Sequence, residues 1–213
     1  MPCQIPPQIQ PRTSLKAALV AAFCVGFVPV AHALPPSKAT DSKATEKPVD
    51  KPRTAVSLDD LYARLKAAED DAEAKGVARL IEQRLGRSGS ATADLLTERA
   101  RQAMSAQDFP LAVELLDRAT ALEPGWSEGW NRRATVFWLL KDQDGAITDL
   151  KRTLVIEPRH YEAWAALGRI YLSMDEKVRA LEAFRRAAAL YPRMDKLQGA
   201  IDRLAPDVDG RDL

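Results

Sequence analysis

Apolar side chains recur at helical spacing over most of the chain, beginning near Ser57. Ser57 and Asp60 have the spacing of a helix capping box, and leucines, a tyrosine and alanines follow every three or four residues. A second apolar set follows Gly76, until a run of Gly and Ser interrupts the pattern. The sequence therefore predicts an N-terminal helical segment at 57–90, with one long helix or two shorter ones over 57–86.

The pattern then becomes periodic. Three prolines stand 34 residues apart, each closing a similar phrase: Pro124 in ALEP, Pro158 in VIEP and Pro192 in ALYP. Counting back from them divides the region 91–194 into three aligned units: 93–126, 127–160 and 161–194. Each unit repeats apolar and small residues at helical spacing, which predicts a helix, a turn and a second helix. One helix pair cannot bury its own apolar face, whereas three stacked pairs share a continuous core.

The third unit has the fullest version of a recognisable motif. It reads W-x2-L-G-x2-Y and then A-x3-F-x2-A-x4-P, filled by Trp164, Leu167, Gly168, Tyr171, Ala180, Phe184, Ala187 and Pro192. This pattern resembles the tetratricopeptide repeat (TPR), a helix-turn-helix unit of 34 residues. The resemblance covers 93–194. It implies an all-α fold, an α-solenoid of TPR repeats with N-terminal lead-in helices and a C-terminal capping helix.

The register within the repeats assigns a side to each residue. Trp130 and Trp164 occupy the same position in successive units and are expected in the core. Arg133 takes a position that is usually aliphatic, so we expect its stem to pack while its guanidinium reaches an acidic partner or the rim. After the repeats, apolar residues on one face predict the capping helix at 195–207, and 208–213 is predicted to be a flexible tail.

The start of the chain has the pattern of a secretory signal peptide. Arg12 and Lys16 precede an uncharged apolar run at 17–30, and A-H-A ends at Ala33. The run of 14 residues is shorter than the roughly 20 that a spanning helix needs. We expect a signal peptide at 1–33, cleaved at about Ala33, and no integral membrane span in the mature chain.

Residues 34–56 are rich in Pro, Lys, Ser and Thr, a composition that cannot support a packed core and predicts a disordered linker. The order of signal, linker, lead-in helices and repeats resembles that of exported bacterial TPR proteins, which implies the periplasm or secretion. Cleavage would remove Cys3 and Cys24, the two cysteines, and turn the formal net charge from +1 to about −1. A charge near zero does not favour nucleic acid as a partner.

Catalytic side chains are few. After cleavage the chain has no cysteine and one histidine, His160, and it contains no H-E-x-x-H, G-x-S-x-G or phosphate-binding glycine loop. His160 falls in a turn between units, where we expect it to face solvent or form a local hydrogen bond. We therefore predict no enzyme, no catalytic residue, no metal site and no cofactor.

The TPR resemblance implies a groove lined by the first helix of each unit. Transferred by position, the residues expected to bind a peptide are Arg101, Asn131, Thr135, Trp138 and Arg169. Arginine pairs with carboxylates through two parallel hydrogen bonds, asparagine can both donate to and accept from a peptide backbone, and tryptophan adds an apolar wall. The set with which some TPR domains clamp a C-terminal carboxylate does not match, because Thr97, Glu162 and Ala166 occupy its positions.

These observations predict a non-enzymatic, exported protein–protein interaction module that binds a peptide or protein segment in the concave TPR groove. The alternative is a structural or assembly protein that forms homo-oligomers or docks a neighbour through the 57–86 helices. The alternative is motivated by Leu58, Leu61, Leu65 and the apolar residues of Val77–Leu85, because a lead-in helix can expose an apolar stripe.

Overall fold

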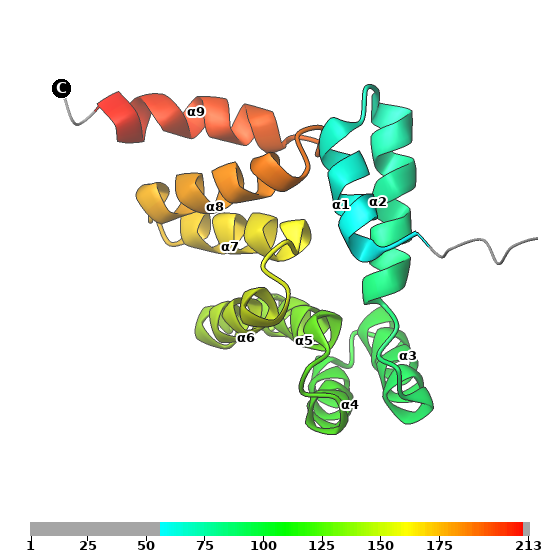
Figure 1. Ribbon diagram of the computed structural model, residues 1–213. Helices are drawn as coiled ribbons and strands as arrows, with labels where there is room; N and C mark the ends of the chain where they lie inside the picture. The colour runs from blue at the N-terminus through cyan, green and yellow to red at the C-terminus, as the bar shows by residue number, and fades with distance from the viewer. Residues whose placement is uncertain (1–55, 211–213) are drawn as a thin grey trace, which may run out of the picture. The chain divides into compact units, whose positions relative to one another are not determined.

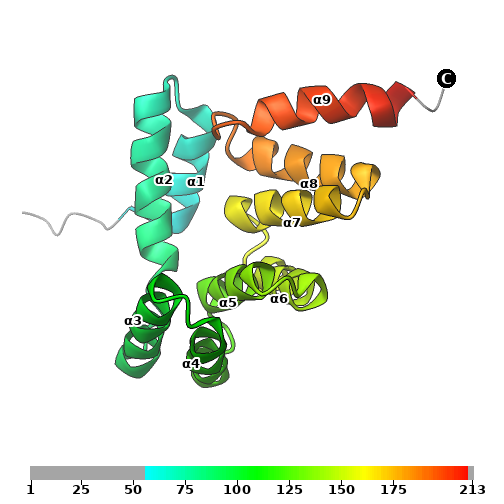
Figure 2. The same cartoon turned by 180° about the vertical axis from the view of Figure 1, so that it is seen from behind.

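The computed structural model describes residues 56–210, and this part of the chain is helical, without strands. The predicted signal peptide, the predicted linker up to residue 55 and the last three residues lie outside the described part. The described helices are α1 (Leu58–Ala67), α2 (Asp71–Leu85), α3 (Ala91–Ser105), α4 (Phe109–Leu122), α5 (Ser127–Leu139), α6 (Gln143–Ile156), α7 (Tyr161–Ser173), α8 (Lys177–Leu190) and α9 (Leu197–Asp209) (Figures 1 and 2). None of these helices is long and apolar enough to cross a membrane.

Helices α3 to α8 form three pairs, α3 with α4, α5 with α6 and α7 with α8, and the predicted all-α repeat solenoid is confirmed. The backbone conformation repeats with the same period as the sequence. In the turn within each pair, one residue adopts a left-handed conformation: Gln107 (φ 62°), Lys141 (φ 65°) and Asp175 (φ 58°). These three residues are 34 positions apart. Asp108 and Asp142 follow the first two and cap the next helix by accepting a hydrogen bond from its backbone.

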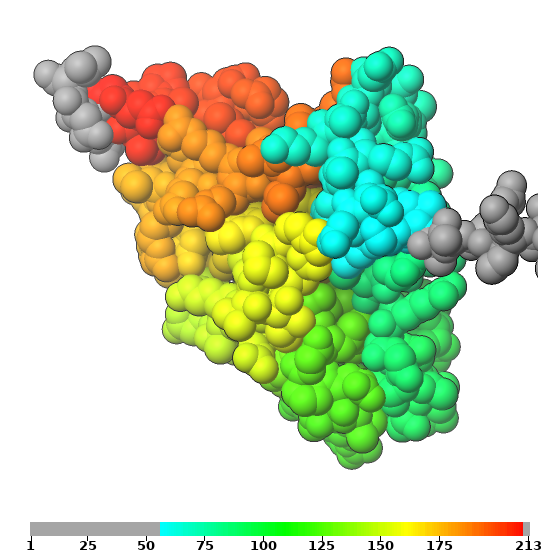
Figure 3. All heavy atoms as spheres, in the orientation of Figure 1, coloured from blue at the N-terminus to red at the C-terminus, as the bar shows by residue number. Residues whose placement is uncertain are grey.

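The predicted lead-in segment contains two helices, α1 and α2. Ser57 and Asp60 form the expected capping box at the start of α1. The α1–α2 hairpin lies across the edge of the stack, against the ends of α7 and α8, as the space-filling view also shows (Figure 3). Its buried residues, among them Leu61 and Leu65, share a cluster with Tyr161 and Tyr191. The expectation that these helices expose an apolar stripe is therefore wrong, since the chain's own repeats cover most of it.

Polar contacts tie this hairpin to each of the three turns that end a repeat. Trp126 donates from Nε1 to the carbonyl of Leu85 at 2.6 Å. Arg159 donates to Asp59 at 2.6 Å, and its guanidinium lies over the ring of Tyr62. At the third turn, the arginine at the same repeat position donates to the hairpin carbonyls and to a carboxylate, the contacts being Arg193 with Ala68, Glu69 and Asp71.

The C-terminal helix extends further than predicted. α9 ends at Asp209, two residues beyond the predicted end of the capping helix, so the tail does not begin at 208. The last turn is held against α8 by two ion pairs, Lys177 with Asp207 at 2.7 Å and Arg185 with Asp209 at 2.5 Å. Val208 adds an apolar contact to the main core cluster. Pro206 lies inside α9, where its missing N–H removes one hydrogen bond from the helix.

The two tryptophans expected in the core are only partly buried. Trp130 and Trp164 lie at the start of α5 and α7, and each donates from Nε1 to the carbonyl of the preceding repeat's proline. An arginine from the second helix of the same repeat covers each ring, Arg152 at 5.9 Å and Arg186 at 5.5 Å from the ring centroid. Both tryptophans lie in the first turn of their helix, which agrees with their partial exposure.

Candidate functional site

Two adjoining hollows lie along the first helices of the repeats. The first hollow lies between α3 and α5, with further contribution from α4, and is lined by Thr97, Ala100, Arg101, Met104, Leu116, Arg132 and Thr135. The second hollow lies between α5 and α7, with further contribution from α6, and is lined by Ala134, Thr135, Trp138, Leu150, Ala166, Arg169 and Ile170. Four of the five predicted binding residues therefore line one or both hollows.

The first hollow combines an apolar floor with two arginines that already have partners. Arg101 donates to Glu98 from Nε at 2.9 Å and from Nη2 at 2.6 Å, and this bond lowers the pKa of the Glu98 carboxyl to about 2. Arg132 donates from Nε to Glu128 at 2.8 Å. Both guanidiniums are therefore engaged with carboxylates of their own helix.

The second hollow is lined by an arginine, Arg169, whose contacts differ from those of Arg101 and Arg132. Trp138, half-buried, forms part of its wall, and the hydroxyl of Thr135 donates to the backbone carbonyl of Asn131 at 3.1 Å. Arg169 forms no hydrogen bond or ion pair with another residue of the described chain. Partial shielding from water lowers the pKa of the Arg169 guanidinium, while the charge of Glu162 acts in the opposite direction. Among the described residues, Arg169 is therefore influenced by the charge of Glu162 without a direct hydrogen bond to it.

Asn131 lies outside both hollows. Its Nδ2 donates to Glu128 Oε2 at 3.0 Å, on the same oxygen that faces His160 Nε2 at 3.1 Å. The sequence-based expectation that this amide binds a peptide backbone stays a prediction. In the structure, the amide helps to hold a buried carboxylate.

His160 is buried, with 1% of its surface exposed, so of the two expected environments it does not face solvent. The local hydrogen bond is present, because Nδ1 accepts from the backbone N–H of Ala163 at 3.3 Å and thereby caps α7. Since Nδ1 accepts this bond, the proton of the neutral ring lies on Nε2, which donates to Glu128. His160 thus joins the start of α7 to the start of α5.

The neighbouring carboxylates have opposite pKa shifts. Burial raises the pKa of Glu128, but the hydrogen bond from His160 and the charge of Arg132 outweigh this effect, so the pKa of the Glu128 carboxyl is lowered. Glu162 has no hydrogen-bond partner among the described residues. Burial raises the pKa of Glu162, and the negative charge of Glu128 adds to this effect.

Among the described residues, Glu128, His160 and Glu162 are close enough together to hold a metal ion. One ligand atom from each of Glu128, His160 and Glu162 lies within 4.8 Å of the others. Coordination through Nε2 requires that nitrogen to be unprotonated. The proton would move to Nδ1, and the capping bond from Ala163 would be lost. The hydrogen bonds therefore favour a structural role for His160.

The sequence did not predict the two leucines that form the floor of the hollows. Leu116 and Leu150 come from the second helices of their repeats, and a pattern read along the first helices alone does not include them. Arg132 also lines the first hollow, although it is not among the predicted binding residues. The 34-residue spacing of Leu116 and Leu150 is the signal that could have identified them.

The fold and these hollows define a helical repeat protein with an inner face that is apolar and edged by arginine. The tetratricopeptide repeat family model matches residues 161–194, which are the third predicted unit. A TPR repeat-containing protein of Rhizobium etli is 31% identical over 141 residues, spanning 64% of this chain and 69% of the relative. The chain therefore belongs to the tetratricopeptide repeat family.

Solved structures share the fold at lower identity. The first TPR domain of Spaghetti (RPAP3), described as bound to the HSP90 peptide SRMEEVD, aligns with a TM-score of 0.53 at 15% identity, over 56% of this chain and 95% of that chain. MamA aligns with a TM-score of 0.52 at 18% identity, over 73% of this chain and 82% of its own. At these identities the likeness shows the shared fold.

Proposed function

We propose that this protein is a non-enzymatic interaction module that holds a peptide or protein segment against α3, α5 and α7. The observation that carries this proposal is the pair of adjoining hollows, which have apolar floors and arginines at their edges. An apolar surface with a few polar groups at fixed positions suits recognition of another chain, because the apolar part supplies affinity and the polar part orientation.

The Spaghetti domain supports peptide binding by this fold, but it does not identify the ligand of the present chain. A solved relative of the same fold is described with an HSP90 peptide. The present chain has Thr97, Glu162 and Ala166 at positions of the carboxylate clamp, so a different segment is the proposed ligand.

The test is a pull-down of partners with matched variants. Arg101→Ala, Asn131→Ala and Arg169→Ala are combined in one protein. The control combines Arg118→Ala, Lys151→Ala and Arg186→Ala, which change exposed cations on the second helices. Partners identified by mass spectrometry should be lost from the first variant and kept by the control. Equal recovery by both variants would reject groove binding.

Export is a separate part of the proposal. The N-terminal pattern supports a protein that is cleaved near Ala33 and acts in the periplasm or outside the cell. The intact mass of the protein recovered from the exported fraction should correspond to a chain that begins at Leu34. An uncleaved chain found only with the cytoplasmic fraction would contradict export and leave the groove proposal standing.

A further inference from the structure

A further cleft lies between the second helices α6 and α8, and it has no lining residue in common with the two hollows. Its apolar lining includes Leu154, Leu167 and Ala183, and Trp164 and Tyr171 of α7 add two aromatic rings. The volume of about 490 Å³ is within the range of roughly 300–1,000 Å³ that is common for binding sites. We call this site the α6–α8 cleft.

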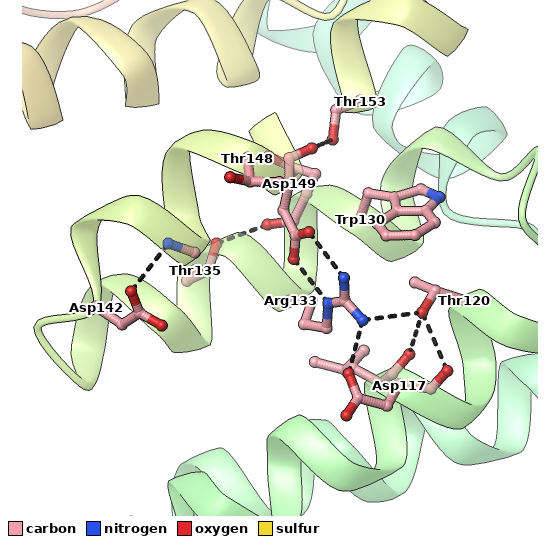
Figure 4. Close-up of polar contacts among 12 residues, drawn as sticks. Asp117, Thr120, Trp130, Arg133, Thr135, Asp142, Thr148, Asp149 and Thr153 are labelled. Atoms are coloured by element: carbon pink, nitrogen blue, oxygen red, sulfur yellow. Dashed lines mark hydrogen bonds and ion pairs between the residues drawn. The ribbon is translucent and has the colours of Figure 1, made fainter. Parts of the chain in front are cut away.

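One repeat earlier, the equivalent place between α4 and α6 is filled by a side chain of this protein. Arg133 pairs there with Asp149 and Asp117 (Figure 4). Its guanidinium lies 4.7 Å from the ring centroid of Trp130 and 5.6 Å from that of Phe137. A flat group between two aromatic rings, with carboxylates beside it, thus occupies the space.

The aromatic positions are kept in the α6–α8 cleft, whereas the three charged positions are replaced. Trp164 and Tyr171 stand 34 residues after Trp130 and Phe137. The other equivalent positions are Arg133 with Leu167, Asp149 with Ala183, and Asp117 with Lys151. Leucine has no group that could reach both rings as the guanidinium does. The cleft therefore has the rings and an apolar base, but its own chain does not fill it.

The charge of the lining is also inverted. Lys151 stands where the other junction has a carboxylate, and among the described residues it has no hydrogen-bond or ion-pair partner. The other charged groups of the lining are engaged, Glu182 with Arg186 and Arg179 with Glu176. A counter-charge for Lys151 therefore has to come from outside the described chain.

We infer that the α6–α8 cleft is a docking site for a partner protein that inserts an aromatic or branched apolar side chain and presents a carboxylate to Lys151. The inserted side chain would lie over Leu167, between the rings of Trp164 and Tyr171. The partner thereby supplies the two components that Arg133 and its carboxylates supply one repeat earlier. The inference does not rest on the proposed groove function, because different residues line the two sites.

The surroundings of the cleft favour a protein over a small molecule. A second hollow adjoins it across α8, and Glu182 lines both. Val155 in the cleft is 71% exposed and Val178 in the adjoining hollow is 64% exposed. Small ligands are usually enclosed on most of their surface, whereas an open apolar surface is typical of protein interaction. Helix α8 has four cationic side chains and one carboxylate, which favours an acidic partner.

The test uses the indole N–H signals of the protein labelled with 15N-tryptophan. The four tryptophans give four signals, which single Trp→Phe variants assign. Trp164 reports on the α6–α8 cleft, Trp138 on the second hollow and Trp130 on the filled junction. The probe is the peptide acetyl-Glu-Glu-Phe-Glu-Glu-amide. Its addition should shift the Trp164 signal in a saturable manner and leave the Trp130 signal unchanged.

Comparison peptides separate the two components. Replacement of the phenylalanine by alanine should weaken binding about tenfold, because the apolar contact is lost. Replacement of the four glutamates by lysines should weaken it by at least about threefold, because Lys151 then faces like charge. Equal affinity for the acidic and the basic peptide would overturn the inference.

Protein variants locate the contacts. Leu167→Arg combined with Ala183→Asp and Lys151→Asp recreates the ion pairs of Arg133, so it should fill the cleft and abolish the Trp164 shift. Val155→Glu is a second variant that changes an exposed side chain only, and its carboxylate should repel the acidic peptide. Arg118→Gln on α4 is the control that should bind normally, since its side chain is exposed and pairs with Glu114. Circular dichroism confirms that each variant is folded.

Failure of this inference can be told apart from failure of groove binding. An unchanged Trp164 signal, equal shifts of Trp164 and Trp130, or normal binding by Val155→Glu would overturn the inference. None of these outcomes affects the groove. In the pull-down, the control variant includes Lys151→Ala, so a ligand of the cleft should be reduced in that control and kept by the groove variant, the reverse of the result for a groove ligand.

Discussion

Arg133 on α5 and Asp149 on α6 form a bidentate ion pair inside the repeat stack. Nε donates to Oδ2 at 2.7 Å and Nη2 to Oδ1 at 2.8 Å, and only 3% of the Asp149 side chain is exposed (Figure 4). Nη1 also reaches Asp117 on α4 at 2.6 Å. The guanidinium thus links the first repeat to the second. The expectation that Arg133 reaches an acidic partner is confirmed.

Removing Arg133 should destabilise the protein strongly. In Arg133→Ala, the buried carboxylate of Asp149 loses its counter-charge, a change that typically costs about 3–5 kcal/mol. Arg133→Met combined with Asp149→Leu should recover most of this loss, because no unpaired charge is then buried. Urea denaturation followed by circular dichroism measures both.

Asp117 provides the matched control for this pair. Its side chain is 53% exposed, so Asp117→Ala should cost less than about 1 kcal/mol. A loss below about 1 kcal/mol for Arg133→Ala would contradict the importance of the buried pair.

Glu128 and Glu162 should affect stability with opposite sign near neutral pH. The pKa of Glu162 is raised in the folded protein, so its ionisation costs stability as pH rises through the folded value. The cost is absent below the unfolded pKa of about 4.3. Glu162→Gln should therefore raise the melting temperature at pH 7. The gain should disappear as the pH falls from the folded pKa of Glu162 to its unfolded pKa.

Glu128→Gln should do the reverse. The lowered pKa of Glu128 means that its ionised form stabilises the fold above the unfolded pKa, and this contribution is lost as pH falls toward the folded value. The variant should melt at a lower temperature at pH 7 and approach the parent protein in acid. Melting curves between pH 3 and 7 for both variants test the pair. Shifts of the same sign at pH 7 would contradict the assignment.

The repeats could be predicted from the sequence because they are local. The prolines, the small residues and the aromatic positions recur within one helix pair, and a partly buried Arg133 requires a counter-charge wherever it lies. The position of the α1–α2 hairpin could not be predicted, because it depends on distant contacts such as Arg159 with Asp59, 100 residues apart. An apolar stripe indicates burial, and the sequence does not say whether the same chain or a partner covers it.

The candidate site could be predicted in part for the same reason. The groove positions on the first helices followed from the repeat register, and Arg101, Thr135, Trp138 and Arg169 line the hollows. The counter-charges could not be read from that register. Whether an arginine of the groove is already paired depends on nearby carboxylates such as that of Glu98. Pairs of this kind also form on helices that have no binding surface, so they do not identify a site.

Arg159 and Arg193 should hold the hairpin onto the repeats. They occupy the same repeat position and contact α1, α2 and the turn between them. Arg159→Ala combined with Arg193→Ala should lower the free energy of hairpin opening by about 1–2 kcal/mol, since each contact is partly exposed to solvent. Hydrogen exchange should then become faster in α1 and α2 and stay unchanged in α5 and α6.

A control arginine on α8 makes this measurement specific. Arg185 pairs with Asp209 on α9, so Arg185→Ala should leave exchange in α1 and α2 unchanged. Faster exchange throughout the chain in the double variant would indicate global destabilisation and contradict local opening of the hairpin.

Gly168 and Phe184 form a small–large pair that differs from its equivalents in the other repeats. Ala100 and Ala134 are the matching small residues, and both face a leucine on the second helix, Leu116 or Leu150. In the third repeat the larger ring leaves no room for a methyl group. A Cβ at residue 168 would lie 2.4 Å from two ring carbons of Phe184.

Gly168→Ala should therefore destabilise the protein by about 1–3 kcal/mol, the usual cost of overpacking a core. Phe184→Leu alone should also destabilise it, because it leaves a void. The two changes together recreate the Ala–Leu pair of the other repeats, so the double variant should be more stable than the sum of the single losses predicts. Urea unfolding of the four proteins measures this coupling, and simple additivity of the two losses would show that the ring does not require glycine.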